Sequence, residues 1–142
     1  MQKPRRKAYH PFVKVARLIY IPERDHTFPA TSPEGPFHGF SVAGVNIAAY
    51  CAARLREAGF EAVFDPGTPV SEEKGEIIEV SMHDFSPEAA IWLASCRAGE
   101  ARSEEGHLLA RKGGEKGLTR IFTRREAVIE RLVYPWDLLE WQ

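Results

Sequence analysis

Two histidines and one aspartate are the residues whose types could do acid–base chemistry. His83 and Asp84 follow an expected strand at 76–82, and His107 opens an expected hairpin. A histidine beside a carboxylate can transfer protons near neutral pH, which would suit a small ribonuclease or RNA-processing enzyme. Adjacent residues on an extended segment point in opposite directions, however, and Asp84 also fits a turn before a helix cap at Ser86. Catalysis by His83 or His107 is therefore the alternative interpretation.

Two glycine-centred patterns approach known motifs without completing them. Gly39 and Gly44 have the spacing of a phosphate-binding loop, but Val45 stands where a lysine would contact the β and γ phosphates. The same stretch approaches a nucleophile elbow around Ser41, but Ala43 replaces the second glycine and a proline-rich segment precedes it. We predict instead that Ser41 caps a helix.

The sequence has no pattern typical of a metal site or of a disulfide framework. The five histidines are scattered, and no pair of histidines or cysteines has the spacing of a zinc site. Cys51 and Cys96 lie in apolar helical contexts, where small buried thiols are expected. The sequence therefore predicts no metal, no cofactor and no disulfide.

Composition and charge restrict the class of protein. The 142 residues fit one compact domain, and no apolar run approaches the roughly 18 residues of a membrane span, so we expect a cytoplasmic protein. One Asn, 16 Glu against 4 Asp and 13 Arg against 6 Lys are typical of a thermophile, and the excess of Arg over Lys also fits a GC-rich genome. Basic and acidic residues number nine and three over 1–56, three and twelve over 57–105, and seven and five over 106–142. This segregation favours partner recognition by complementary charge over general nucleic-acid binding.

The first half of the chain predicts a strand, a long loop and a helix. Residues 12–21 are rich in β-branched and aromatic side chains and predict a central or near-central strand. Four prolines within 22–38 exclude regular structure, and a loop of this length is a candidate partner surface. The helix is expected to begin after Ser41 and to end at Gly59. Its expected buried stripe comprises Val45, Ala48, Ala49, Ala52 and Leu55.

The second half predicts two strands, a helix, a hairpin and a third helix. Short strands are expected at 61–64 and 76–82, the second burying Ile78, Val80 and Met82. Ser86 and Pro87 predict a helix start, and Gly99 its end, with Ile91, Trp92, Ala94, Ser95 and Ala98 facing inward. A charged link at 100–106 would lead to a hairpin of 107–112 and 118–123. The expected third helix has Thr123 and Glu126 at capping-box spacing, apolar positions at Val128, Ile129, Leu132 and Val133, and an end at Pro135.

These elements predict an α+β two-layer sandwich with a mostly antiparallel sheet. A ferredoxin-like βαββα opening would be followed by a C-terminal hairpin and helix. The domain would span 12–142, and 1–11 would be a basic N-terminal arm that contacts nucleic acid at most weakly.

The proline-rich loop and the aromatic C-terminus are the strongest candidates for contact with another protein. Aromatic and arginine side chains are enriched at interface hot spots. The candidate partner-binding residues are Arg24, Phe28, Phe37, Tyr134, Trp136, Leu138 and Trp141. We expect some of the terminal aromatics to pack on the domain itself, Trp136 more than Trp141.

The leading interpretation is a non-catalytic protein-binding regulator. In its size, thermophile-like composition and lack of a complete catalytic motif, the chain resembles the small regulators by which phages of thermophilic bacteria bind host RNA polymerase. That resemblance implies contact with the polymerase or its initiation factor, modulation of transcription, and no cofactor. A structural subunit of a larger assembly is a third possibility.

Overall fold

The structure is a computed structural model that describes residues 14–21, 41–42, 45–66, 77–113 and 117–131. Its elements in chain order are β1 (Val15–Ile19), β2 (Ser41–Val42), β3 (Val45–Asn46), α2 (Ile47–Glu57), β4 (Ala62–Phe64), β5 (Ile77–Ser81), β6 (Asp84–Phe85), α3 (Pro87–Ala94), β7 (Gly99–Ser103), β8 (Leu108–Lys112), β9 (Leu118–Phe122) and β10 (Glu130–Arg131). Neither described helix is long and apolar enough to cross a membrane.

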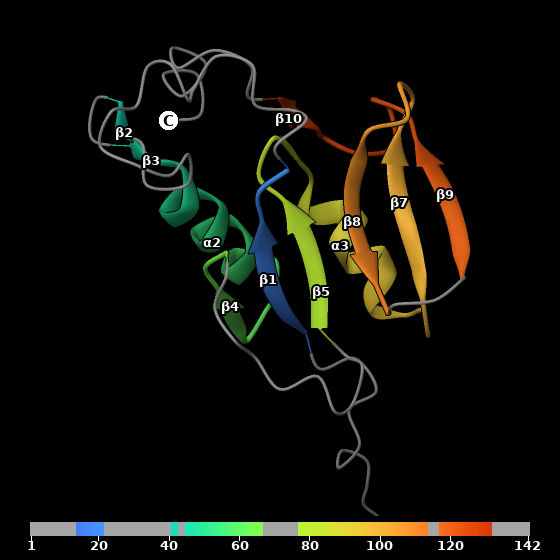
Figure 1. The fold of residues 1–142 in the computed structure, drawn as a ribbon, viewed down its shortest axis with the longest axis horizontal. Coiled ribbons are helices and arrows are strands. Elements are labelled where there is room, and N and C mark those ends of the chain that lie inside the picture. The colour runs from blue at the N-terminus through green and yellow to red at the C-terminus, as the bar shows by residue number, and fades with distance from the viewer. Residues whose placement is uncertain (1–13, 22–40, 43–44, 67–76, 114–116, 132–142) are drawn as a thin grey trace, which may run out of the picture.

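Six of the strands form one mixed sheet in the order β4-β1-β5-β8-β7-β9 (Figure 1). β1 pairs in parallel with β4 and β5, and β7 pairs in parallel with β9, whereas β8 runs antiparallel to β5 and β7. The α+β class is confirmed. The expectation of a mostly antiparallel sheet is wrong, since three of these five pairings are parallel, and the strand order is not that of a ferredoxin-like unit.

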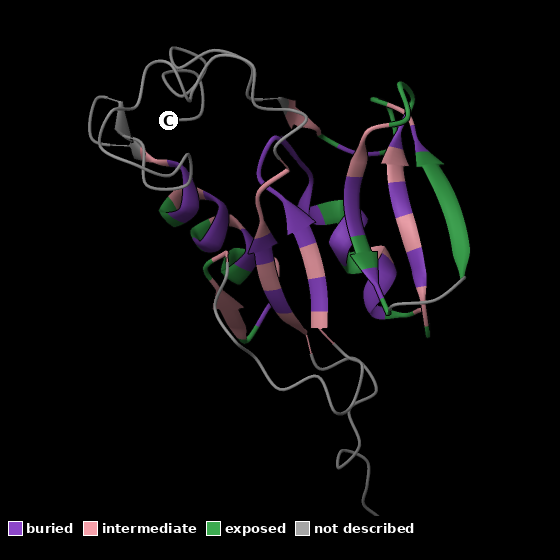
Figure 2. Cartoon of the chain, viewed as in Figure 1, coloured by how far each residue is buried: buried purple, intermediate pink, exposed green. Residues whose placement is uncertain are grey.

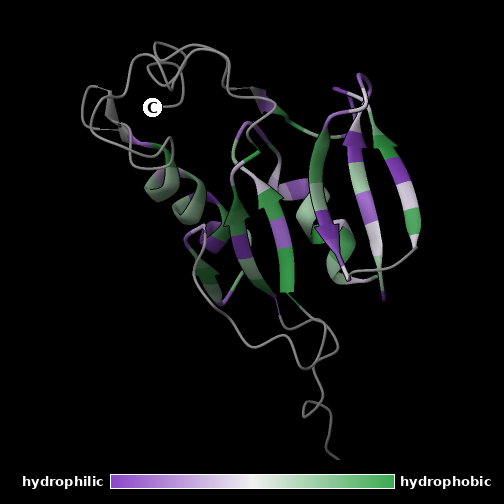
Figure 3. Ribbon diagram, in the orientation of Figure 1, coloured by the Kyte–Doolittle hydropathy of each residue, from purple (hydrophilic) through white to green (hydrophobic). Residues whose placement is uncertain are grey.

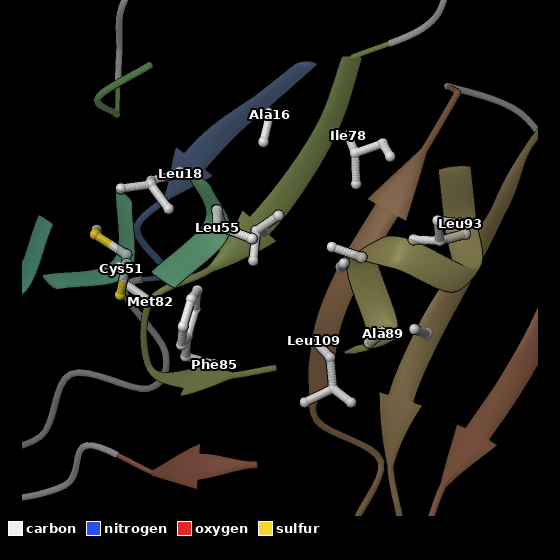
Figure 4. Close-up of a cluster of buried hydrophobic side chains, with 14 of the residues drawn as sticks. Ala16, Leu18, Cys51, Leu55, Ile78, Met82, Phe85, Ala89, Leu93 and Leu109 are labelled. Atoms are coloured by element: carbon white, nitrogen blue, oxygen red, sulfur yellow. The ribbon is translucent and has the colours of Figure 1, made fainter. Parts of the chain in front are cut away.

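The core lies between the two helices and one face of this sheet (Figure 4). Ala16 and Leu18 of β1 stand beside Ile78 and Val80 of β5, and Val80 stands beside Ala110 of β8, so all five share a face. All five are fully buried. Leu55 of α2 and Leu93 of α3 belong to the same cluster. The predicted burial of Ile78, Val80 and Met82 is confirmed, although Ser81 between the last two is buried as well. Both helices therefore cover the same side of the sheet.

The opposite face of the sheet carries a row of alternating charges. Arg17 of β1, Glu79 of β5, Arg111 of β8 and Glu100 of β7 are successive cross-strand neighbours. Glu79 accepts hydrogen bonds from Arg17 and, at 2.6 Å, from Arg111 Nε. Burial alone would raise the pKa of Glu79, but these two arginines lower it below its usual range. Hydrophilic bands accordingly interrupt the hydrophobic ribbons of β1 and β5 in Figure 3.

β7 corrects the sequence prediction of a charged link at 100–106. Gly99, Ala101 and Ser103 are buried, while Glu100 and Arg102 point to the other face. The alternation is real, but its inward members are small rather than large and apolar, which is why the segment lacks the usual strand signature. Because β7 lies between β8 and β9, the expected hairpin of 107–112 with 118–123 does not form.

The first helix begins later than the sequence predicted. Ser41 lies in β2, and the N-cap of α2 is Asn46, whose side chain accepts a hydrogen bond of 3.0 Å from Ala49 N. Val45 lies in β3 and Ala49 is exposed, so the predicted stripe holds only at Ala48, Ala52 and Leu55. The predicted helix stop at Gly59, which has a φ of +106°, is confirmed.

The second helix starts as predicted but presents a different face. Ser86 is the N-cap, accepting from Ala89 N at 3.3 Å, and Pro87 is the first helical residue. The helix ends at Ala94, before Gly99. Ile91 and Ser95 are exposed, and the buried residues of the helix are Pro87, Ala89, Ala90, Leu93 and Ala94. Periodicity alone did not identify the rotation of so short a helix.

The predicted third helix does not form within 123–131. Thr123 and Glu126 do contact each other, at 3.2 Å between Oγ1 and Oε2, but only a single turn follows. The chain then extends into β10, which pairs antiparallel with β6, so backbone pairing replaces helical hydrogen bonds here. Val128 is 54% exposed. The helix positions Leu132, Val133 and Pro135 lie outside the described residues, as do the arm 1–11 and the loop 22–38.

Candidate functional site

The strand order creates a switch point between β1 and β5. From β1 the chain passes through α2 to β4 on one side, and from β5 it passes through α3 to β7 on the other. In doubly wound sheets, which have helices on both faces, ligands bind beyond the carboxyl ends of two such neighbouring strands. This sheet shares the switch point, although its two helices cover one face. The carboxyl edge of β1 and β5 is therefore the position to examine for chemistry.

The three residues proposed for acid–base chemistry all lie at this edge. His83 and Asp84 follow the carboxyl end of β5, and His107 directly precedes β8, which runs antiparallel to β5 and so begins at the same edge. Nδ1 of His107 lies 3.9 Å from Oδ2 of Asp84. The sheet thus brings together an imidazole and a carboxylate that are far apart in the sequence.

Asp84 and His107 differ sharply in exposure. The Asp84 side chain is fully buried, whereas the His107 side chain is 33% exposed. Nδ1 of His107 is itself buried, so the exposure belongs to the rest of the ring. The separation of 3.9 Å is an ion-pair distance rather than a hydrogen bond. This arrangement suits a carboxylate that orients a ring whose other nitrogen can meet a substrate.

Two serines hold the backbone on either side of this pair. The hydroxyl oxygen of Ser81 accepts from the N–H groups of His83, at 3.1 Å, and Asp84, at 3.3 Å. Ser103 Oγ accepts from the N–H of His107 at 3.1 Å. Both serines are buried, so they serve as turn-forming acceptors and not as accessible nucleophiles.

A β-bulge shapes the strand that follows His107. The pairing of β7 with β8 shifts register next to Ala101, and as a result the consecutive residues Leu109 and Ala110 are both fully buried. A bulge bends its strand and re-aims nearby side chains, and bulges recur beside active sites. Neither periodicity nor motif searching signals this feature.

His83 has a structural environment. Its side chain is fully buried, and its ring centroid lies 5.5 Å from that of Tyr20, the residue directly after β1. A fully buried ring cannot contact a substrate at the surface. Of the two histidines that the sequence offered for catalysis, the geometry favours His107.

A polar cluster fixes the strand that pairs with Asp84. Tyr50 donates to the carboxylate of Glu130 at 2.9 Å, and Arg54 donates to Tyr50 at 2.7 Å and to Glu130 at 3.1 Å. Tyr50 also packs edge-on against Phe85, with ring centroids 6.5 Å apart. The cluster joins α2 to β10, and β10 is paired with β6, whose first residue is Asp84. No sequence signal pointed to this cluster.

We expect high pH to weaken the fold through Tyr50. Burial and the Glu130 carboxylate raise the pKa of Tyr50 from 10.0 to about 12. Between these pH values the unfolded chain loses the phenolic proton while the folded chain keeps it. The free energy of unfolding therefore falls as pH rises. The stabilisation is complete below pH 10 and is lost as pH approaches the folded value. Urea denaturation across this range should give a steeper decline for the wild type than for Tyr50→Phe, and equal slopes would contradict the assignment.

The prediction of buried thiols is confirmed for Cys51 and only in part for Cys96. Cys51 is fully buried, and burial raises the pKa of its thiol well above the usual range. Cys96 is half-buried and donates its S–H to the carbonyl of Trp92 at 3.6 Å. Within the described ranges, no three His, Cys, Asp or Glu side chains are grouped to hold a metal ion.

The remaining site predictions concern residues that the structure does not describe. The glycine-centred motif residues Gly39, Ala43 and Gly44 belong to this group. So do all the candidate partner-binding residues, namely Arg24, Phe28, Phe37, Tyr134, Trp136, Leu138 and Trp141. These stay predictions from the sequence.

No protein-family model, curated protein or solved structure matches this sequence or its fold.

Proposed function

We propose that His107 and Asp84 act as an acid–base pair that cleaves RNA. The observation that carries the proposal is the contact of 3.9 Å between His107 Nδ1 and the buried Asp84 carboxylate, at the carboxyl edge of β1 and β5. Catalytic contacts often shorten when the substrate binds. At hydrogen-bond distance the carboxylate would hold the proton on Nδ1 and so leave Nε2 free to accept one. The sequence offered this ribonuclease function as an alternative, with His83 or His107 as the catalytic histidine. The proposal assigns the role to His107.

RNA is the favoured substrate because it carries its own nucleophile. Nε2 of His107 would take the proton of a ribose 2′-hydroxyl as that oxygen attacks the adjacent phosphorus. The bond from phosphorus to the 5′-oxygen breaks, the leaving oxygen takes a proton from water, and the product ends in a 2′,3′-cyclic phosphate. The step needs one protein base and no nucleophilic side chain, which agrees with the buried hydroxyls of Ser81 and Ser103.

We expect His107→Ala to slow cleavage of single-stranded RNA by about 10²- to 10⁴-fold, the usual contribution of a general base. Product formation would be followed with a labelled oligonucleotide, and the matched deoxyribonucleotide should remain intact because it lacks the 2′-hydroxyl. Glu57→Gln, an exposed change at the far end of α2, serves as the control. Cleavage of DNA at a similar rate, or full activity in His107→Ala, would contradict the mechanism.

A second candidate is the protein-binding regulator of the leading sequence interpretation. Its structural support is a group of exposed apolar side chains on and after β9, with Leu118 63%, Ile121 49% and Val128 54% exposed. Apolar side chains left exposed along an edge strand are available to pack against a partner. The resemblance to phage regulators makes RNA polymerase or its initiation factor the proposed partner.

For this candidate we expect the wild type to bind RNA polymerase holoenzyme from a thermophilic bacterium. Trp141→Ala should weaken that binding by about 2 kcal/mol or more with little change in melting temperature, the behaviour of a hot-spot anchor. Fluorescence anisotropy of the labelled protein would give both affinities. A wild type that fails to bind the holoenzyme would remove this partner, and a destabilised Trp141→Ala would make that residue part of the core.

A further inference from the structure

β9 forms one edge of the sheet, and its side chains are open to solvent along most of its length. Among the described residues it pairs with β7 alone. Leu118, Thr119, Arg120 and Ile121 are exposed, and only Phe122 is buried, as the exposed colour along β9 shows in Figure 2. An edge strand with open backbone groups is a template for pairing with another chain.

The phase of the β7–β9 ladder identifies which backbone groups are open. Leu118 N donates to Ala98 O at 3.3 Å, and Leu118 stands opposite Gly99 in the parallel pairing. In a parallel pair, alternate residues bond to the neighbouring strand, so Leu118, Arg120 and Phe122 face β7. The N–H and C=O groups of Thr119 and Ile121 therefore point away from the sheet.

The usual protection of an edge strand is missing from β9. Natural edges are blunted by charged side chains, proline or bulges. The one charged side chain of β9 is turned back, with the Arg120 guanidinium 4.4 Å from the Phe122 ring centroid and 2.7 Å from Glu126 Oε1. Leu118 and Ile121 are left as the exposed large apolar side chains of this edge.

Positive charge lies directly beyond the carboxyl end of β9. Arg124 and Arg125 are both exposed, and no described carboxylate forms an ion pair with either guanidinium. The nearby Glu126 is already engaged by Arg120, and Glu104 accepts from the backbone N–H of Arg124. An acidic group next to this end of the strand would find two available partners.

We propose that β9 binds an extended segment of a partner protein as an additional strand. The segment would bond to the open backbone groups of Thr119 and Ile121, place β-branched or aromatic side chains beside Leu118 and Ile121, and carry an acidic residue beside Arg124 and Arg125. Strand addition draws affinity from main-chain hydrogen bonds and specificity from alternate side chains. The inference rests on the protein-binding candidate, for which it supplies the mode of binding and the chemistry of the partner.

The test uses the full chain and a displayed library of random 12-residue peptides. Leu118 and Ile121 lie three positions apart on the strand and therefore face opposite sides of the sheet. Selected peptides should accordingly carry two β-branched or aromatic residues three positions apart, and Asp or Glu toward one end. Ile121→Pro removes an N–H that points away from the sheet and breaks no hydrogen bond to β7. The variant should therefore keep the fold but bind a selected synthetic peptide at least 10-fold more weakly. Ile121→Thr keeps that N–H and should lose less. Arg124→Glu combined with Arg125→Glu should weaken the acidic peptide similarly.

A second measurement is independent of how well Ile121→Pro folds. The selected peptide would be N-methylated at every second residue, in each of the two phases. One phase removes the N–H groups that face β9 and should abolish binding, while the other should bind as the parent does. Equal binding of both phases, no enrichment of acidic peptides with apolar residues three positions apart, or full binding by Ile121→Pro would each overturn the proposal.

The experiments distinguish a failure of strand addition at β9 from a failure of the protein-binding function itself. Holoenzyme binding that survives Ile121→Pro while the peptide fails would leave a protein-binding function but remove β9 from it. A self-association detected by sedimentation and lost in Ile121→Pro, with no selected peptide, would make a second copy of the chain the occupant and overturn the partner assigned above.

Discussion

Asp84→Asn is expected to reduce RNA cleavage by about 10²- to 10⁴-fold while the protein stays folded. The Asp84 carboxylate can only accept hydrogen bonds, so a hydrogen bond to it would favour the tautomer of His107 with hydrogen on Nδ1. Asparagine has nearly the same shape, but its amide can donate to Nδ1 and favour hydrogen on Nε2. His107 would then present a donor where the reaction needs a base.

Steady-state rates for Asp84→Asn and the wild type would measure this effect. Because Asp84 acts through His107 and does not touch RNA, kcat should fall with little change in KM. Glu104→Gln is the matched control, since Glu104 is a carboxylate in the β7–β8 turn that also contains His107 and lies outside the pair. A loss confined to KM, or an equal loss in Glu104→Gln, would show that the Asp84 carboxylate does not orient the base.

Gly117→Ala is expected to be the most destabilising small substitution in the sheet. Gly117 lies against the start of β7, where a Cβ on Gly117 would lie 2.3 Å from Ala98 O and 2.7 Å from Gly99 N. Both atoms belong to the backbone and cannot swing aside. The β7–β9 pairing must therefore move, at a cost of about 3 kcal/mol, the upper range for overpacking.

Gly106→Ala provides the control for Gly117→Ala. Gly106 lies in the β7–β8 hairpin with a φ of +90°, and no atom lies within 4 Å of its would-be Cβ. Its substitution should cost only about 1 kcal/mol of backbone strain. Urea denaturation of both variants would give the two free energies of unfolding. A Gly117→Ala variant no less stable than Gly106→Ala would argue against the close approach of β9 to β7.

The sequence was sufficient where the determining interactions are local. The alternation of Ile78, Val80 and Met82 predicted the buried face of β5, and the Ser86 and Pro87 pair predicted the start of α3. Gly59 predicted the end of α2, because a left-handed residue is needed at that point. Each of these signals acts within one turn of helix or within one strand, so neighbouring residues carry all the information required.

Tertiary structure decided the features that depend on residues far apart in the chain. β7 has small inward side chains and becomes a strand because β8 and β9 supply its hydrogen bonds on both sides. Residues 130–131 became β10 through pairing with β6 and through the contact of Glu130 with Tyr50, which overrode a helical pattern.

The candidate site belongs to the same category. The sequence identified His83, Asp84 and His107 as residues with suitable chemistry, but it could not distinguish the two histidines or show that His107 lies near the aspartate. The antiparallel pairing of β5 with β8 places His107 beside Asp84, and burial against Tyr20 removes His83 from the surface. Strand order is set by the packing of the whole sheet, because a β-strand completes its hydrogen bonds only with partners elsewhere in the chain.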